Sequence, residues 1–342
     1  MANREGGLKV AERVRLGIVG CGRVVSLFHI KAIRRVDGID VTAVVDVDEG
    51  RMRKALKNFG AERGYTDYVD MLREDVVDAV LVATPPRFHG KISLTSVRAG
   101  KHVICEKPLA EAPEECLEIG REASKRGVKV LPAHNYVFTP ILQKAKTAVE
   151  LGLIGEVERI ECSMGESLRM YGSKTDFRLR RAGGVVDDLL PHILSVATYL
   201  HGPPLKPVWA KASSRRYSVP DEAELLLELE GGVELHTSLS WNKIIPSFSV
   251  SVEGSRGRVE MELSKSPSSM TLVRDGRREK VRVGGLAEQY LSLLKLEHPS
   301  FTAQYEHFLR LVRGEEPERI TVGDEYRIVL TTIKAIKMLK KL

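Results

Sequence analysis

Unbroken apolar runs alternate with amphipathic stretches along the first 133 residues of the chain. An apolar run without polar interruptions is typical of a parallel strand that is covered on both faces. The stretches between the runs repeat their apolar residues at helical spacing. This alternation predicts an α/β fold with a doubly wound parallel sheet. The predicted strands are Val14–Gly20, Val41–Asp46, Val77–Ala83, His102–Cys105 and Val128–Leu131, and the predicted helices are Arg23–Arg35, Glu49–Phe59, Tyr68–Arg73, Phe88–Ala99 and Pro113–Lys125.

The pattern changes near residue 134, where strands begin to follow one another with few helices between them. Tight turns such as Glu230-Gly231-Gly232 separate these strands, which is typical of an antiparallel meander. We therefore expect an α/β domain over residues 1–133 and an α+β domain over residues 134–342. The second domain contains an open, mostly antiparallel sheet with helices on one face, and its last helix is placed to pack back on the first domain. The predicted strands are Val157–Met164, Lys206–Arg215, Glu222–Leu229, Val233–Trp241, Ser247–Glu253, Gly257–Leu263 and Ser269–Arg274, and the predicted helices are Pro140–Leu151, Asp188–Leu200, Phe301–Arg313 and Asp324–Lys341.

The composition adds limits on location and partners. With 43% apolar and 29% charged residues, the 342-residue chain is an ordinary globular protein. No apolar run approaches the ~18 residues of a membrane span, and the first residues lack the apolar segment of a signal peptide, so we expect a cytoplasmic protein without a membrane partner. The four cysteines are scattered without a C-x-x-C pair, which predicts reduced thiols and no metal site. The net charge of +7 suits an anion or nucleic acid, but the charges alternate in sign and only 6% of residues are aromatic, so no nucleic-acid partner is expected.

A glycine-rich motif, Gly20-Cys21-Gly22-Arg23-Val24, connects the first predicted strand to the first predicted helix. Gly20 permits a tight turn, and Gly22 lets the backbone approach a pyrophosphate that lies on the N-terminus of the helix. Arg23 and Val24 are candidate cofactor contacts in the same turn. The third position of the G-x-G-x-x-G pattern is Val25, so the motif depends on its strand–turn–helix context.

Two further segments follow strands at the same edge of the predicted sheet. Asp46 stands where a carboxylate accepts hydrogen bonds from the adenosine ribose and repels a 2′-phosphate, which favours NAD, while Arg51 keeps NADP open. The alternative is a nucleotide-free fold in which Asp46 caps the strand end. In Thr84-Pro85-Pro86-Arg87-Phe88-His89, the Pro-Pro turn makes a stiff wall for a nicotinamide ribose, with Thr84, Pro85 and His89 as candidate contacts. The alternative is a rigid loop that starts a helix.

The stretch Gly100-Lys101-His102-Val103 leads into Glu106-Lys107-Pro108. The chain resembles the glucose–fructose oxidoreductase, inositol dehydrogenase and rhizopine catabolism (Gfo/Idh/MocA) family over nearly its whole length. The resemblance rests on this stretch, on the motifs above, on Gly152-Leu153-Ile154-Gly155-Glu156 and on segment 183–192. The resemblance implies a Rossmann domain that binds NAD or NADP. It implies an oxidoreductase that moves a hydride between nicotinamide and a secondary hydroxyl of a sugar, polyol or sugar derivative, acidic or nucleotide-linked ones included. It also implies a homodimer or homotetramer formed through the open sheet.

The resemblance assigns roles to two side chains after the fourth predicted strand. Glu106 lies beside the cofactor, and Lys107 relays a proton, since partial burial near a cationic nicotinamide favours its neutral amine. The peptide between Lys107 and Pro108 is often cis in the family, which sequence does not reveal. From composition alone, the alternative is a surface lysine before a loop.

Asp188 and His192 match the residues that meet the substrate in this family. They are four residues apart and share one face of a regular helix. His192 removes or delivers the hydroxyl proton while Lys107 polarises the oxygen, or the two exchange these roles. Asp188 orients the substrate or His192. The alternative for Asp188 is a helix N-cap, because Pro191 suits a first helical turn.

Three positions depart from the family pattern. Leu190 stands where the family has glycine, and it would narrow or reshape the pocket. Ser195 stands where the family has aspartate, and it removes an acceptor used on a polyol. Together they cast doubt on inositol or a simple hexose as the substrate. Val137 stands where many relatives have arginine.

The basic segment Asp176-Phe177-Arg178-Leu179-Arg180-Arg181 offers a substrate contact. Arg178 is its best candidate to grip a carboxylate or phosphate, and the alternative is a solvated loop or a helix cap. Tyr136 adds an aromatic wall.

Two rival functions stay open: a non-catalytic cofactor-binding sensor, and an enzyme that uses bound NAD transiently.

Four other large side chains are given structural interpretations. His29 is expected to pack within the first helix, and His201 to cap the end of a helix. Trp209 and Trp241 alternate with strand residues, so both are expected on the outer, exposed or subunit-facing side of the open sheet.

Overall fold

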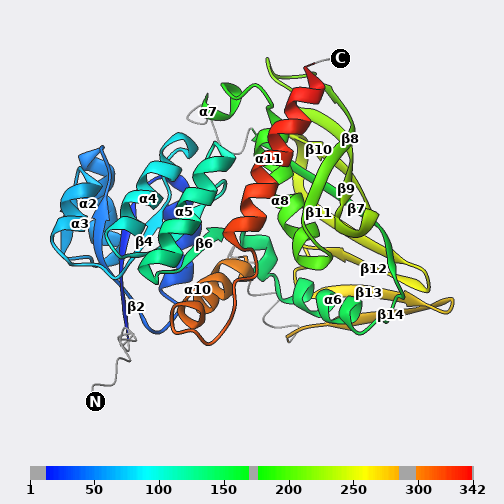
Figure 1. The fold of residues 1–342 in the computed structure, drawn as a ribbon, viewed down its shortest axis with the longest axis horizontal. Helices are drawn as coiled ribbons and strands as arrows, with labels where there is room; N and C mark the ends of the chain where they lie inside the picture. Colours follow the sequence, from blue (N-terminus) through cyan, green and yellow to red (C-terminus); the bar gives the residue numbers. More distant parts are fainter. Residues whose placement is uncertain (1–12, 169–175, 285–297, 341–342) are drawn as a thin grey trace.

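Two sheets and the helices that cover them make up the fold, and a computed structural model describes residues 13–168, 176–284 and 298–340 of it (Figure 1). The first sheet has six parallel strands in the order β3-β2-β1-β4-β5-β6. This confirms the doubly wound arrangement that the apolar runs predict. Its strands are β1 (Val14–Val19), β2 (Ile39–Val45), β3 (Arg63–Tyr65), β4 (Ala79–Val82), β5 (His102–Glu106) and β6 (Val130–Ala133).

The helices of this first half differ from the expectation at one place. Within the predicted helix Arg23–Arg35, residues Val25–His29 form a wider π-helical turn, which is followed by a short α-helix. Single π turns inside helices are frequent at functional sites. The apolar pattern does not predict β3, because this edge strand has three residues and none is fully buried. The helices are α1 (Ile30–Ile33), α2 (Glu49–Phe59), α3 (Tyr68–Arg73), α4 (His89–Arg98) and α5 (Pro113–Arg126).

The second sheet has eight strands in the order β14-β13-β12-β11-β7-β10-β9-β8, antiparallel except for the pair β10–β7. The simple meander is therefore wrong at its centre, because β7 lies between β10 and β11. Short turns identify consecutive strands, but an earlier strand can still insert between them. Strand β14 is mostly charged, as edge strands often are, and so lacks an apolar signature. The strands are β7 (Val157–Ser167), β8 (Pro204–Ser213), β9 (Glu222–Leu229), β10 (Glu234–Ser240), β11 (Asn242–Gly254), β12 (Gly257–Glu262), β13 (Ser269–Arg274) and β14 (Arg277–Arg282).

Helices cover one face of this sheet. Helix α8 packs on β7, β9 and β10, helix α6 on β12 and β13, and helix α11 on β8. Buried residues alternate with partly exposed ones along β9 and β10, as one covered face requires. No helix in the described ranges is long and apolar enough to cross a membrane. The helices are α6 (Pro140–Glu150), α7 (Asp176–Leu179), α8 (Val185–Leu200), α10 (Pro299–Val312) and α11 (Val322–Leu339).

Helix α11 lies between the two halves (Figure 1). It begins with a capping box, in which the side chains of Thr321 and Asp324 each bond the other's backbone N–H. It packs against α5 of the first half and against α8 and β8 of the second. The C-terminal helix thereby ties the two sheets together beside the cavity described next.

Candidate active site

A cavity of about 2140 Å³ opens at the carboxyl edge of the first sheet, with walls from α8 and the second sheet. Ligands of doubly wound sheets bind outside the carboxyl ends of the strands. The structure brings every candidate side chain or glycine named above to this one cavity. Its lining includes Gly20, Gly22, Arg23, Val24, Asp46, Thr84, Pro85, His89, Glu106, Lys107, Tyr136, Arg178, Asp188 and His192.

The glycine turn leaves room for a pyrophosphate. Gly20 has φ +95°, and a Cβ there would lie 2.6 Å from the carbonyl oxygen of Ala83, so only glycine fits. A Cβ at Gly22 would meet no atom within 4 Å, so this backbone faces open space. Thr84 lines the same cavity, and its hydroxyl oxygen is buried without a hydrogen-bond partner in the described part of the chain. This cradle and the available hydroxyl fit a dinucleotide.

Asp46 follows β2 and is only 7% exposed. It accepts hydrogen bonds from the backbone N–H groups of Cys21 and Asp48, both at 2.9 Å, and pairs with the Arg51 guanidinium at 2.8 Å. Burial opposes ionisation of this carboxyl, but the bonds from Arg51 and the two amides hold its pKa below the usual value. Asp46 therefore caps the local backbone and also presents a negative charge at the edge of the cavity, with a cation beside it.

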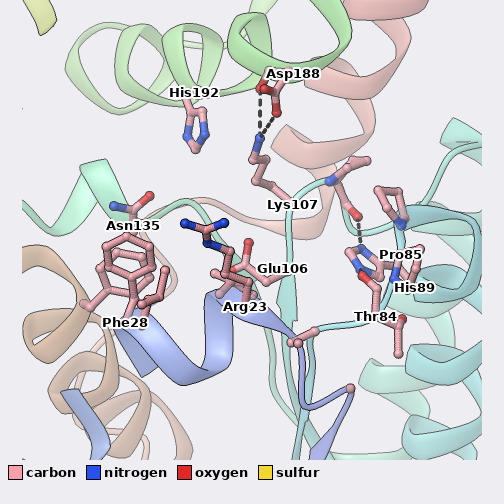
Figure 2. A pocket seen from close by; sticks show the side chains of 18 of the residues that line it. Arg23, Phe28, Thr84, Pro85, His89, Glu106, Lys107, Asn135, Asp188 and His192 are labelled. Carbon is pink, nitrogen blue, oxygen red and sulfur yellow. Dashed lines mark hydrogen bonds and ion pairs between the residues drawn. The ribbon is translucent and has the colours of Figure 1, made fainter. Parts of the chain in front are cut away.

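Lys107 meets Asp188 across the cavity (Figure 2). Its ammonium donates to the carbonyl oxygen of Asp188 at 2.8 Å and to the carboxylate at 3.2 Å. Arg178 Nε donates to the other carboxylate oxygen at 2.9 Å, and the indole N–H of Trp241 lies 3.3 Å from that same oxygen. Burial opposes ionisation of Asp188, but Lys107 and Arg178 hold its pKa far below the usual range. The peptide that joins Lys107 to Pro108 is cis.

The alternative interpretation of Asp188 and the expectation for Trp241 are both wrong. Helix α8 begins at Val185 after Gly184, so Asp188 lies inside the first turn and is not its N-cap. Trp241 does not lie on the outer face of the sheet, because it is 2% exposed and its indole donates to Asp188. Trp241 continues the alternation of β10, in which Leu235, Thr237 and Leu239 are buried, so its ring points to the covered face of the sheet. Trp209 does lie outside, at 46% exposed.

The side chain of His192 projects from α8 into the cavity, one helical turn after Asp188 (Figure 2). Its ring lies edge-on to Tyr136, with centroids 5.3 Å apart. Its Nδ1 is buried and has no hydrogen-bond partner in the described ranges. Burial and the nearby Lys107 ammonium lower the pKa of His192 well below its usual value. The imidazole is therefore neutral near pH 7 and able to accept a proton.

The three departures from the family pattern do not line the cavity. Leu190, Ser195 and Val137 are each fully buried in the core. The hydroxyl of Ser195 donates to the carbonyl oxygen of His192 at 2.9 Å. Leu190 therefore does not narrow the pocket by lining it, and neither Leu190 nor Ser195 is placed to meet an inositol or hexose directly.

Sequence reasoning missed a buried pair beneath the site. Glu325, in the first turn of α11, accepts from the N–H of Leu109 at 2.9 Å and lies 2.5 Å from His134 Nε2. Both side chains are fully buried. In sequence, a glutamate at the start of a helix looks like an ordinary N-terminal charge. The pair supports the loop after Lys107 from below.

His29 also does more than pack. Its Nε2 lies 2.9 Å from Glu106, and its Nδ1 lies 2.7 Å from the hydroxyl of Tyr305. The ring is fully buried and links the cavity-lining Glu106 to α10. His201 does cap α8, and its Nε2 bonds the carbonyl oxygen of Glu230 at 2.8 Å.

Comparison with known proteins adds two family matches. Residues 14–134 match the model of an oxidoreductase family with an NAD-binding Rossmann fold, and residues 142–260 match that of the GFO/IDH/MocA C-terminal domain. Myo-inositol 2-dehydrogenase of Thermotoga maritima is 24% identical over 336 residues, which are 96% of this chain and 97% of that protein. Inositol 2-dehydrogenase 1 of Saccharopolyspora erythraea is 31% identical over 280 residues, which are 79% of each chain.

Solved structures show the same fold. Levoglucosan dehydrogenase in complex with NADH and levoglucosan matches with a TM-score of 0.82, at 19% identity, over 96% of this chain and 98% of that one. The WlbA dehydrogenase of Bordetella pertussis in complex with NADH and UDP-GlcNAcA matches with a TM-score of 0.79, at 19% identity, over 97% of this chain and 96% of that one. At this level of identity the likeness concerns the fold alone.

Proposed function

The chain belongs to the GFO/IDH/MocA family of oxidoreductases, and from that premise we propose that it oxidises a secondary hydroxyl of a sugar, polyol or sugar derivative with a nicotinamide dinucleotide. The observation that carries the proposal is the meeting of Lys107, Asp188 and His192 in one cavity with the glycine turn. Relatives named for inositol and levoglucosan support the substrate class.

His192 and Lys107 divide the proton chemistry. Oxidation of a hydroxyl removes a hydride from carbon and a proton from oxygen. A bound nicotinamide supplies the hydride acceptor. His192 accepts the proton, because its buried ring is neutral. Lys107 donates a hydrogen bond to the same oxygen and stabilises the negative charge that develops there. Asp188 keeps the ammonium in place through two bonds, with Arg178 and Trp241 holding its carboxylate.

The residues at the carboxyl edge of the first sheet hold the cofactor in this proposal. Asp46 receives the adenosine ribose, which favours NAD, and Arg51 provides the group that NADP would use. His89 acts through the backbone carbonyls of Thr84 and Pro108. The direct contacts assigned are Gly20, Gly22, Arg23, Val24, Asp46, Thr84, Pro85, Glu106 and Lys107.

The outer face of the second sheet is the proposed subunit interface. In the part of the chain that the structure describes, helices cover only the other face, and Trp209 on β8 is half exposed together with Leu205 and Val208. A large uncovered sheet face is typical of an interaction surface. Light scattering should show a dimer or tetramer, and Trp209→Glu should shift it toward the monomer. A monomeric wild-type protein would contradict this assignment.

Nicotinamide reduction across a substrate panel tests the activity. Inositols, hexoses, anhydrosugars, sugar acids and nucleotide sugars would each be offered with NAD and with NADP. Lys107→Met should lower kcat by about 10²–10⁴-fold while NADH binding, measured by fluorescence, persists. The matched control is Lys125→Met, whose lysine side chain is 72% exposed. Turnover that survives in Lys107→Met would refute the role of Lys107. Silence across the panel, with NADH bound, would favour the non-catalytic sensor.

A further inference from the structure

His89 joins two loops at the carboxyl edge of the first sheet. It is the first residue of α4 and is 1% exposed. Its Nδ1 lies 2.7 Å from the carbonyl oxygen of Pro108, after β5. Figure 2 shows the His89 ring near Thr84 at this edge of the sheet. Its Nε2 lies 2.7 Å from the carbonyl oxygen of Thr84, after β4. One ring therefore holds both loops that border the proposed nicotinamide site.

Both partners of this ring are acceptors only. A carbonyl oxygen has no hydrogen to donate, so each ring nitrogen of His89 has to supply one. A neutral imidazole carries a single N–H, and an imidazolium carries two. With one proton, a ring nitrogen would aim its lone pair at a carbonyl oxygen in a buried place, which leaves both groups unsatisfied.

Other histidines with two bonded ring nitrogens do not require the second proton. His298 accepts at Nδ1 from the N–H of Ser300 and donates from Nε2 to the carbonyl oxygen of Leu263. His29 lies between a tyrosine hydroxyl, which is able to donate, and a carboxylate. A neutral ring satisfies each of them. Within the described ranges, only His89 places both nitrogens against backbone carbonyls.

We propose that His89 is an imidazolium in the folded protein and acts as a positioning residue for Lys107. The inference rests on the proposed function in one respect, because it takes Lys107 as the group that meets the substrate hydroxyl. The ring fixes the carbonyl of Pro108, the residue after Lys107, and so sets the direction in which the lysine leaves the backbone. It also fixes the Thr84 loop, so one side chain sets the spacing between the nicotinamide wall and the ammonium.

Acidic groups surround the ring and compensate its charge. Glu325 on α11 is fully buried, and Glu106 on β5 is 16% exposed. Desolvation opposes ionisation of both carboxyls, but a neighbouring histidine holds the pKa of each below its usual value, and His89 acts in the same direction. Glu115 on α5 packs against Gly90, the residue after His89. The cation on the adjoining loop is Lys107. A buried cation faced by these carboxylates is electrostatically reasonable.

Imidazole ¹⁵N NMR of the full-length protein tests the protonation directly. Ring-labelled histidine is incorporated, and the His89 signals are assigned by their loss in His89→Gln. We expect both ring nitrogens of His89 to show protonated shifts at pH 7, and His298 to show one bare nitrogen. A bare nitrogen on His89 at pH 7 would overturn the proposal, whatever the protein catalyses. Only the assignment needs the variant, and the protonation itself is read in the wild-type protein.

The positioning role is tested by kinetics of His89→Gln. The amide can donate to one carbonyl but cannot bridge both, so we expect kcat to fall about tenfold while KM changes less than about threefold. His201→Gln is the matched control, because a neutral ring satisfies the single bond of His201 to a carbonyl. An unchanged kcat in His89→Gln would refute the positioning role. Wild-type protein that has a doubly protonated His89 but lacks turnover would refute the proposed function and still support the imidazolium.

Discussion

Replacing Asp188 by asparagine removes the charge that two cations share. The carboxylate pairs with Lys107 at 3.2 Å and with Arg178 at 2.9 Å. Asp188 is 12% exposed, Lys107 15% and Arg178 17%, so water screens their charges only weakly. Asparagine keeps the shape and one acceptor oxygen, but it leaves two cations side by side without an anion.

The size of the effect follows from burial. Removing one partner of a buried ion pair costs about 3–5 kcal/mol, and the acceptor that asparagine retains returns part of it. We therefore expect Asp188→Asn to lower the free energy of unfolding by about 3 kcal/mol at pH 7. The same substitution in Asp70, which is 58% exposed beside Arg73, should cost less than about 1 kcal/mol.

Urea unfolding of both variants measures this difference. The pKa of Asp188 is lowered in the folded protein, so its contribution is fully present above the unfolded pKa of about 3.9 and is lost as pH falls toward the folded pKa. The gap between wild type and Asp188→Asn should stay constant from pH 8 to about pH 5 and shrink in more acidic solution. If Asp188→Asn is no less stable than Asp70→Asn, the shared-charge reasoning is refuted.

Because its pKa is lowered, His192 should remain a neutral base as pH falls from 7 to 6, so kcat/KM should stay constant over this range. A fall of kcat/KM to half near the usual histidine pKa of about 6.5 would contradict this. Asp46→Ser should raise the ratio of kcat/KM with NADP to kcat/KM with NAD by about tenfold or more. The substitution removes a carboxylate that repels a 2′-phosphate, and it releases Arg51 to meet that phosphate. An unchanged ratio would count against this. Gly20→Ala should lower the free energy of unfolding by about 2–4 kcal/mol, because its Cβ would overlap a backbone carbonyl. Gly22→Ala, which meets no atom, should unfold like wild type, and equal losses in the two variants would refute the steric argument.

The first sheet was predictable because burial on both faces makes each of its central strands an apolar run. The same reasoning could not find β3 or β14, which are edge strands and need no such run. Nor could it place β7 at the centre of the second sheet. That placement depends on which strand fills the gap between β10 and β11, a tertiary choice that the turns do not encode.

The candidate site shows a different limit. The motifs identified Lys107 and the helix that carries Asp188 and His192, because strand ends and helical spacing are local properties. Helical geometry alone contradicts the expectation that Leu190 faces the pocket. Two residues from Asp188 correspond to about 200° around a helix, so Leu190 points away from the face that carries Asp188 and His192. The burial of Trp241 also had a local signal, because Trp241 follows Leu235, Thr237 and Leu239 in the alternation of β10 and that row faces the covered side of the sheet.

Polar contacts between the two halves of the fold gather on the stretch of chain that follows β5. Three pairs attach there: Lys107 with Asp188, the N–H of Leu109 with Glu325, and Glu111 with Arg181. The first of these is also the proposed catalytic pair. Docking of the halves and positioning of the ammonium are therefore one event, since neither half alone supplies both Lys107 and the carboxylate that orients it. It follows that a substitution far from the cavity that loosens α8 or α11 should lower kcat before it unfolds the protein, because the lysine loses its orienting partner first.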